Sequence, residues 1–247
     1  MNADLSRKLT KRAGVIAAVV ASIAWAPGHA NTYNFATPDG SVVGDGPVSA
    51  SATFATSANS IQITLTDLLA NPTSVGQLVS DISFRADGLT SGTGGANVPS
   101  ANYVAVGAGG ITSAGACCAN WALTSDNGIY HLTALAGGAH TGPAYLIIGP
   151  ADASGVYSDA NGSIARNRPH NPFIEESAFF TLAVTGATAS TVISDVVFSF
   201  GTQEGVNVPA MTAVPIPAAL WLFGSGLLAF GAIAKRGTGA GRSVMPA

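Results

Sequence analysis

Charge is scarce in this sequence, and lysine is confined to its two ends. Charged residues make up 9% of the 247 residues, well below the roughly 25% usual in soluble domains. Between residues 31 and 212 there is no lysine, and twelve carboxylates stand against three arginines, a net charge of −9. A basic stripe is the electrostatic footprint of nucleic-acid binding. Its absence excludes a nucleic-acid partner.

Sequence signatures of catalysis are missing as well. The chain has no G-x-S-x-G nucleophile elbow, no P-loop and no G-x-G-x-x-G after a predicted strand. These motifs carry the nucleophile or the phosphate cradle of large enzyme classes. We therefore expect no catalytic residues and no cofactor, and a chain that is not an enzyme.

The first thirty residues have the three-part order of a secretory signal peptide. Basic residues come first, an apolar run follows over residues 13–26, and Gly28 and Ala30 put small side chains at positions −3 and −1 of a cut after Ala30. This order is typical of export. We expect residues 1–30 to be removed, and His29 with them.

A second apolar run lies near the C-terminus. Residues 216–234 carry no charge, and as a helix they span about 28 Å, close to the ~30 Å hydrocarbon core of a bilayer. Lys235 and Arg236 follow at once and stay cytoplasmic by the positive-inside rule. The sequence predicts one transmembrane helix, an exported domain over residues 31–212 and a short cytoplasmic tail over residues 237–247.

The start of this run resembles a known sorting signal. Val214, Pro215, Ile216 and Pro217 precede Ala-Ala-Leu-Trp-Leu-Phe-Gly-Ser-Gly-Leu-Leu, and the basic pair closes the helix. Residues 213–236 are thus similar to the PEP-CTERM signal of exported bacterial proteins, in a Val-Pro-x-Pro variant with Ile216 in place of the acidic residue. The resemblance implies processing by an exosortase-like membrane protease, often in strains that make extracellular polysaccharide. It transfers no activity to the domain.

Between the two ends, apolar and small polar residues alternate with the period of a half-buried strand. The pattern runs through residues 48–54, 60–66, 179–185 and 192–200. Asn127-Gly128 separates candidate strands at 121–124 and 129–135 and suits a type I′ hairpin turn. We expect a mainly β fold, an antiparallel β-sandwich-like ectodomain, with a short helix near residues 66–69 or 75–79.

Cys117 and Cys118 are the only cysteines and are neighbours. Across a trans peptide their Cα atoms lie ~3.8 Å apart, below the roughly 4.4–6.8 Å normal for disulfides. Two interpretations stay open. One is a vicinal disulfide in a redox-sensitive loop or an intermolecular link. The other is a local strained turn or two unremarkable thiols, which the absence of nearby bases favours.

Metal-binding patterns are sparse. His131, His140 and His170 lack the spacing of a zinc site, so we expect the first to point outward from a strand and the last to cap a turn. A polar loop over residues 151–163 holds three candidate calcium ligands, Asp152, Asp159 and Asn161. The loop does not follow the EF-hand order, and turn formation explains these residues equally well. The sequence therefore predicts no metal.

Two side-chain pairs bear on other functions. Glu175 and Glu176 are adjacent acids, and neighbours on a strand point to opposite faces, so we expect that they do not flank one glycosidic bond. Thr64 and Thr66 form a threonine pair, but no repeat extends it into the flat array that ice binding requires. The same sorting signal also occurs on proteins named for ice binding, so the label stays open.

These observations predict an exported bacterial envelope or extracellular protein. It would begin as an inner-membrane-anchored precursor with a periplasmic domain and then reach the cell surface or the medium. We expect a structural, non-enzymatic role in association with matrix or biofilm polysaccharide. Two alternatives stay open: a carbohydrate- or calcium-binding module, and a secreted hydrolase whose acids are dispersed in the sequence.

Overall fold

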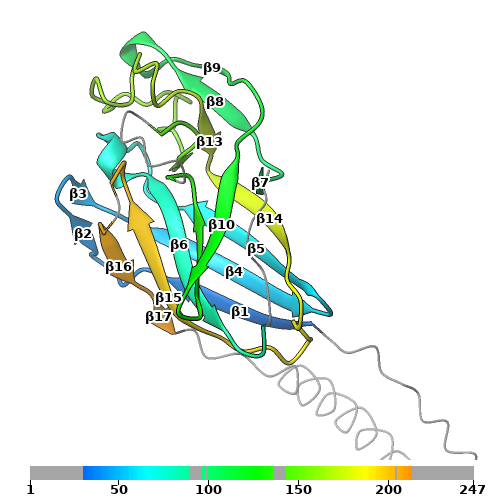
Figure 1. Cartoon of the computed structure of the whole chain (residues 1–247). Helices are drawn as coiled ribbons and strands as arrows, with labels where there is room; N and C mark the ends of the chain where they lie inside the picture. The colour runs from blue at the N-terminus through cyan, green and yellow to red at the C-terminus, as the bar shows by residue number, and fades with distance from the viewer. Residues whose placement is uncertain (1–29, 90–95, 98, 136–142, 204, 213–247) are drawn as a thin grey trace, which may run out of the picture.

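The computed structural model describes residues 30–89, 96–97, 99–135, 143–203 and 205–212 (Figure 1). Strands dominate this part of the chain, and its two helices are single 3-10 turns, Val75–Gln77 and Ala108–Gly110. The prediction of a mainly β fold is confirmed. Val75–Gln77 falls in one of the two stretches expected to be helical, whereas residues 66 and 67 end a strand.

The first sheet consists of five strands within the described residues. In spatial order they are β14 (Ser177–Ala183), β5 (Ser60–Asp67), β4 (Ala50–Ser57), β1 (Asn31–Ala36) and β17 (Met211–Thr212). All neighbours are antiparallel. On β5 the inward side chains Ile61, Ile63 and Leu65 are fully buried, while the hydroxyl and amide side chains between them face out. The alternation in the sequence therefore gives this sheet its two faces.

The second sheet is larger and more irregular. Its path runs β7 (Ala96–Asn97), β10 (Trp121–Asp126), β11 (Ile129–Thr133), β6 (Val79–Ala86), β12 (Ile147–Ile148), β13 (Phe173–Glu175), β8 (Tyr103–Val106) and β9 (Thr112–Ala114). On the other edge of β6 lies β15 (Ile193–Phe200), followed by β16 (Asn207–Pro209). A separate small ribbon pairs β2 (Val42–Val43) with β3 (Gly46–Pro47).

One strand pair departs from the expected antiparallel arrangement. β12 and β13 run parallel, with Ile147 opposite Ile174. Parallel neighbours need a crossover of a dozen residues or more, and the loop over residues 149–172 supplies it. The sequence prediction of an entirely antiparallel domain is therefore wrong at this pair, because the loop carries no alternating pattern that indicates the direction of return.

The two sheets lie face to face (Figure 1), and aromatic side chains pack between them. Phe54 of β4 meets Phe84 of β6 at a ring-centroid distance of 5.1 Å, and Phe180 of β14 meets Trp121 of β10 at 5.2 Å. A second apolar cluster, which includes Tyr157 and Phe173, lies under the crossover loop. Burial of large rings against each other is the main stabilising contribution to such a core.

The predicted hairpin is present. β10 and β11 pair antiparallel from Asp126 opposite Ile129, and the intervening Asn127 and Gly128 have φ values of 50° and 79°. A type I′ turn requires positive φ at both central positions. The Asn-Gly dipeptide thus correctly indicated the turn, and this hairpin carries two of the strands on which the candidate site is built.

Candidate functional site

The outward face of the second sheet carries a row of polar side chains brought together by strand register. Asp81 on β6 lies opposite Thr133 on β11 and opposite Ser199 on β15, and Ser199 in turn lies opposite Asn207 on β16. Two residues further along these strands, and so on the same face, His131 lies opposite Ser83. The inward neighbours Ile82 and Phe84 belong to the core. Because side chains alternate across a strand, the polar residues share the opposite face.

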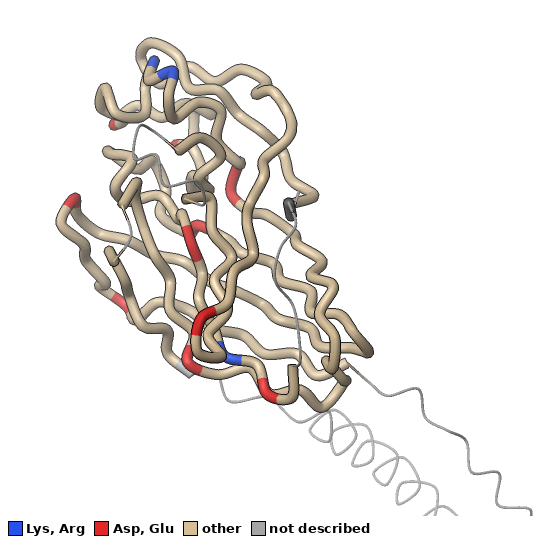
Figure 2. The backbone as a smooth tube through the Cα atoms, viewed as in Figure 1, with Lys and Arg blue, Asp and Glu red and all other residues tan. Residues whose placement is uncertain are grey.

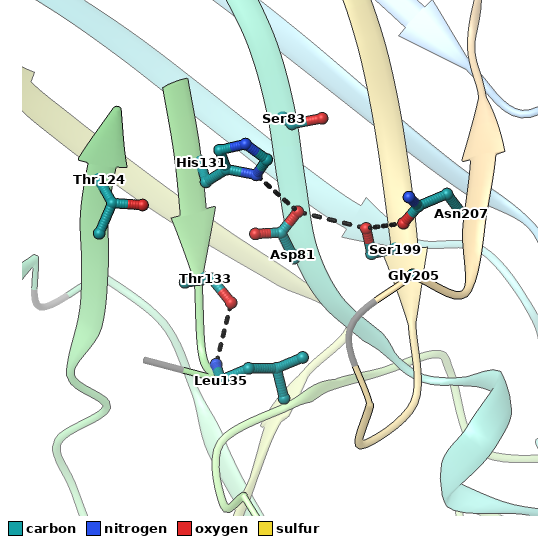
Figure 3. A pocket seen from close by; sticks show the side chains of 9 residues that line it. All are labelled: Asp81, Ser83, Thr124, His131, Thr133, Leu135, Ser199, Gly205 and Asn207. Atoms are coloured by element: carbon teal, nitrogen blue, oxygen red, sulfur yellow. Dashed lines mark hydrogen bonds and ion pairs between the residues drawn. The ribbon is translucent and has the colours of Figure 1, made fainter. Parts of the chain in front are cut away.

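These residues line a hollow of about 490 Å³ (Figure 3). Asp81 lies at its base with 8% of its surface exposed, whereas the His131 side chain is 40% exposed. Thr124 and Leu135 complete the wall on the β10–β11 side. We call this the Asp81 hollow. Its volume lies within the roughly 300–1,000 Å³ of small-molecule sites.

Within the described residues, both polar contacts of the Asp81 carboxylate are made by one oxygen, Oδ1. Oδ1 accepts a hydrogen bond from the Ser199 hydroxyl at 3.2 Å and lies 3.9 Å from Nδ1 of His131, close enough for an ion pair when the imidazole is protonated. The Ser199 hydroxyl is also 2.7 Å from Oδ1 of Asn207. Figure 3 shows the second carboxylate oxygen of Asp81 turned away from Ser199 and toward the β11 side.

The order of these groups matters for chemistry. In nucleophilic catalysis by serine, the imidazole lies between the hydroxyl and the carboxylate so that it can take the hydroxyl proton. Here the carboxylate lies between the hydroxyl and the imidazole. The Ser199 hydroxyl has a single proton, and its acceptors are Asp81 and Asn207 rather than an imidazole, an arrangement that suits hydrogen bonding to a ligand better than attack on one. The sequence holds no indication of Asp81, Ser199 or Asn207, and of His131 it predicts only that the side chain points outward from a strand.

The two adjacent acids occupy a second, shallower hollow. Glu175 and Glu176 line it together with Ser100, Asn102 and Ser177. The premise that both lie on one strand does not hold, because Glu176 lies between β13 and β14 with a φ of 58° and interrupts the strand alternation. The alternation rule therefore does not decide whether the two acids can act together.

A buried carboxyl lies near the end of β5. Asp67 is fully buried; its Oδ1 accepts from the Leu69 amide at 3.0 Å, and its Oδ2 is without a hydrogen-bond partner within the described residues. Burial raises the pKa of this carboxyl well above its ordinary value, against the opposing effect of the amides of Leu69, Val79 and Gly149. The sequence does give a signal for it, since Asp67 continues the inward series of Ile61, Ile63 and Leu65.

Burial also raises the pKa of Tyr157 under the crossover loop, with further contributions from the negative charges of Glu175, Glu176 and Asp67. The Tyr157 hydroxyl donates to the Gly149 carbonyl at 3.0 Å. This tyrosine therefore serves as a neutral hydrogen-bond donor that holds the loop to the end of β12.

Two of the three candidate calcium ligands, Asp152 and Asn161, use their side-chain oxygens to shape the loop. Asp152 accepts from the amides of Ser154 and Val156, and the Ser158 hydroxyl and the Ser154 amide lower its carboxyl pKa. Asn161 accepts from both the amide and the hydroxyl of Ser163, and the Asp159 amide donates to Asn71. Among the described residues there is no group of three His, Cys, Asp or Glu side chains able to hold a metal. Turn formation accounts for the side chains of Asp152 and Asn161.

The remaining sequence candidates lie apart from the Asp81 hollow. Nδ1 of His170 lies 3.2 Å from the Pro143 carbonyl, so this histidine links two loops. Cys117 and Cys118 are paired as a vicinal disulfide across a cis peptide bond. Thr64 lies between Thr53 and Phe179 on the outer face of the first sheet, which interrupts any threonine array there. His140 lies outside the described residues.

The segments that carry the targeting predictions also lie outside the described residues. These are the signal peptide over residues 1–30 apart from Ala30, the motif Val214, Pro215, Ile216 and Pro217, and the basic pair Lys235 and Arg236. Within the part of the chain that the structure describes, no helix is long and apolar enough to cross a membrane. The predicted transmembrane helix is therefore neither confirmed nor contradicted.

Charge is sparse over the whole described domain (Figure 2). Arg85 and Asp195 form an exposed ion pair at 3.2 Å on the same sheet as the Asp81 hollow. Comparison of the chain with protein-family models, with curated proteins and with solved structures finds no match.

Proposed function

We propose that this chain is an exported bacterial protein that associates with extracellular polysaccharide through a β-sandwich-like ectodomain and acts by binding. Its place would be the outer side of the inner membrane first and the cell surface or matrix afterwards. The signal peptide and the sorting-signal resemblance support this route. Val214, Pro215, Ile216 and Pro217 would be the motif that an exosortase-like protease recognises, with Lys235 and Arg236 ending the membrane segment.

The Asp81 hollow is the observation that carries the binding role. It presents carboxylate, amide, imidazole and hydroxyl groups from five strands on one outward sheet face. Such groups act together as donors and acceptors for a polyhydroxylated ligand. The position of Asp81 between Ser199 and His131 argues for binding rather than nucleophilic chemistry.

The test is to follow the mature chain in its host. We expect intact-mass analysis to find a chain that begins at Asn31 in both the membrane and the extracellular fractions, with the extracellular form ending near residues 214–218. We also expect the extracellular form to co-purify with polysaccharide. A chain that keeps Met1 in the cytoplasm, or that separates completely from polysaccharide, contradicts the proposal.

One observation favours a second candidate, a secreted glycoside hydrolase. Glu175 and Glu176 line one hollow, and paired carboxylates are the usual machinery for glycoside hydrolysis. Turnover of a glycan panel by the wild type, abolished in both Glu175→Gln and Glu176→Gln, would establish it. Identical, background-level hydrolysis by wild type and variants removes it.

A further inference from the structure

We propose that the Asp81 hollow binds an uncharged sugar unit, with Asp81 as the residue that accepts hydrogen bonds from the ligand's hydroxyl groups. This inference rests on the proposed polysaccharide association and names the ligand class and the central residue. Asp81 is only 8% exposed at the base of an open hollow, so its carboxylate needs hydrogen-bond donors to offset the loss of water.

The donors that the described protein supplies reach mainly one side of the carboxylate. Oδ1 accepts from the Ser199 hydroxyl, and His131 is 3.9 Å from the same atom. Oδ2 is turned toward the β11 side of the hollow (Figure 3). A carboxylate is an acceptor with two oxygens. A ligand that enters the hollow must therefore present donors to Asp81, and a sugar hydroxyl does so.

The rest of the wall suits a ligand that both donates and accepts. Ser83, Thr124 and Thr133 carry hydroxyls, which can do either, and Asn207 carries an amide. A sugar ring has hydroxyls of the same dual character around its edge. The hollow of about 490 Å³ has the size expected for one or two such rings.

The local charge excludes anionic sugars. Asp81 places a negative charge at the base of the hollow, and the residues from 31 to 212 contain no lysine and carry a net charge of −9. The described arginine on this sheet, Arg85, is engaged with Asp195. A uronate or a sulfated sugar would therefore meet repulsion rather than an ion pair. A metal-bridged mode is not supported either, since no group of three ligating side chains occurs among the described residues.

The experiment uses the full-length chain in mild detergent and measures the binding of tetrasaccharides by calorimetry. The probes are neutral glucan, mannan and galactan tetrasaccharides, with a galacturonan tetrasaccharide as the anionic comparison. We expect at least one neutral probe to bind and the galacturonan not to bind. Asp81→Asn keeps the side-chain shape, but it loses the charge and one acceptor oxygen. Hydrogen bonds to charged groups contribute about 1.5–3 kcal/mol, so affinity should fall roughly ten- to hundredfold.

Asp126→Asn is the matched control. It makes the same chemical change on an exposed residue of the same sheet, at the tip of the β10–β11 hairpin and outside the hollow. We expect its affinity for the neutral probe to equal that of the wild type. Equal weakening by both substitutions would show a general charge effect and overturn the assignment of Asp81.

A measurement on the wild type covers the case in which Asp81→Asn does not fold. The imidazole resonances of His131 should shift when the neutral tetrasaccharide is added, because His131 lines the hollow, whereas those of His170 should not. His131→Gln identifies the signal. Binding without a His131 shift overturns the site but leaves polysaccharide association intact. Preference for galacturonan overturns the ligand class, and failure of every neutral probe to bind overturns the inference as a whole.

Discussion

Asp67 offers a quantitative test of how the core is built. Its carboxyl is fully buried at the end of β5, one oxygen accepts from the Leu69 amide, and burial raises its pKa well above the ordinary value of 3.8. The folded chain therefore keeps Asp67 protonated over a range of pH in which the unfolded chain ionises it. This difference makes the free energy of unfolding depend on pH.

The sign follows from the direction of the shift. A raised folded-state pKa contributes stability that is fully present below the unfolded value and is lost as pH rises toward the folded value. Each pH unit in that interval removes about 1.4 kcal/mol from the free energy of unfolding. Asparagine keeps the size of the side chain and an acceptor for Leu69 but does not ionise. We predict that Asp67→Asn gains about 1.4 kcal/mol per pH unit relative to the wild type between the ordinary pKa and the raised folded-state pKa.

Urea unfolding of both full-length chains, followed by circular dichroism at about pH 4.5, 5.5 and 6.5, measures this difference. Asp126→Asn, on an exposed hairpin tip, serves as the control and should show no comparable slope. Other groups titrate in both proteins, so the comparison isolates Asp67. If Asp67→Asn is less stable than the wild type by a constant amount across the range, the carboxyl is ionised in the folded chain and the reasoning fails.

Three further predictions concern the packing and the backbone, and each is measured by the shift in urea midpoint. Phe54→Ala should lower the free energy of unfolding by about 3–5 kcal/mol, because its ring is fully buried between Phe35 and Phe84. Phe179 is 39% exposed, so Phe179→Ala should lower it by under about 1 kcal/mol. Similar losses in the two variants would contradict the assigned faces of the first sheet. Gly149→Ala should be strongly destabilising, because the added Cβ would collide with the Leu69 carbonyl. At Gly162 an added Cβ meets nothing within 4 Å, so Gly162→Ala should be neutral. Equal stability of the two variants would contradict the close approach of Gly149 to Leu69. Gly128→Ala should cost about 1 kcal/mol, since alanine is strained at a φ of 79°; an unchanged midpoint would argue against the type I′ turn.

The elements that the sequence predicts well are those with local signals. The strands β4 and β5 are predicted by their alternation, and the β10–β11 hairpin by strand patterns with turn residues directly between them. Strand limits differ by only a few residues, as in Ile193–Phe200 where residues 192–200 were expected. The hairpin turn followed from Asn127 and Gly128 alone, since few dipeptides adopt positive φ twice.

The Asp81 hollow was not predicted, because no local pattern encodes it. Asp81 and Ser199 are 118 residues apart in sequence, and their meeting depends on the register between β6 and β15. A bulge near Asp195, whose φ is 49°, shifts that register. The sequence also predicts that Glu175 and Glu176 lie on one strand. A positive φ at Glu176 separates β13 from β14 at this point, and no local pattern in the sequence indicates it.

Retention on the host's own extracellular polysaccharide is the most direct test of polysaccharide binding by the Asp81 hollow. The full-length chain is mixed with that polysaccharide, and the bound fraction is compared among the wild type, Asp81→Asn and Asp126→Asn. We expect the wild type and Asp126→Asn to be retained and Asp81→Asn to be lost. Wild-type protein that passes through entirely unretained would contradict it.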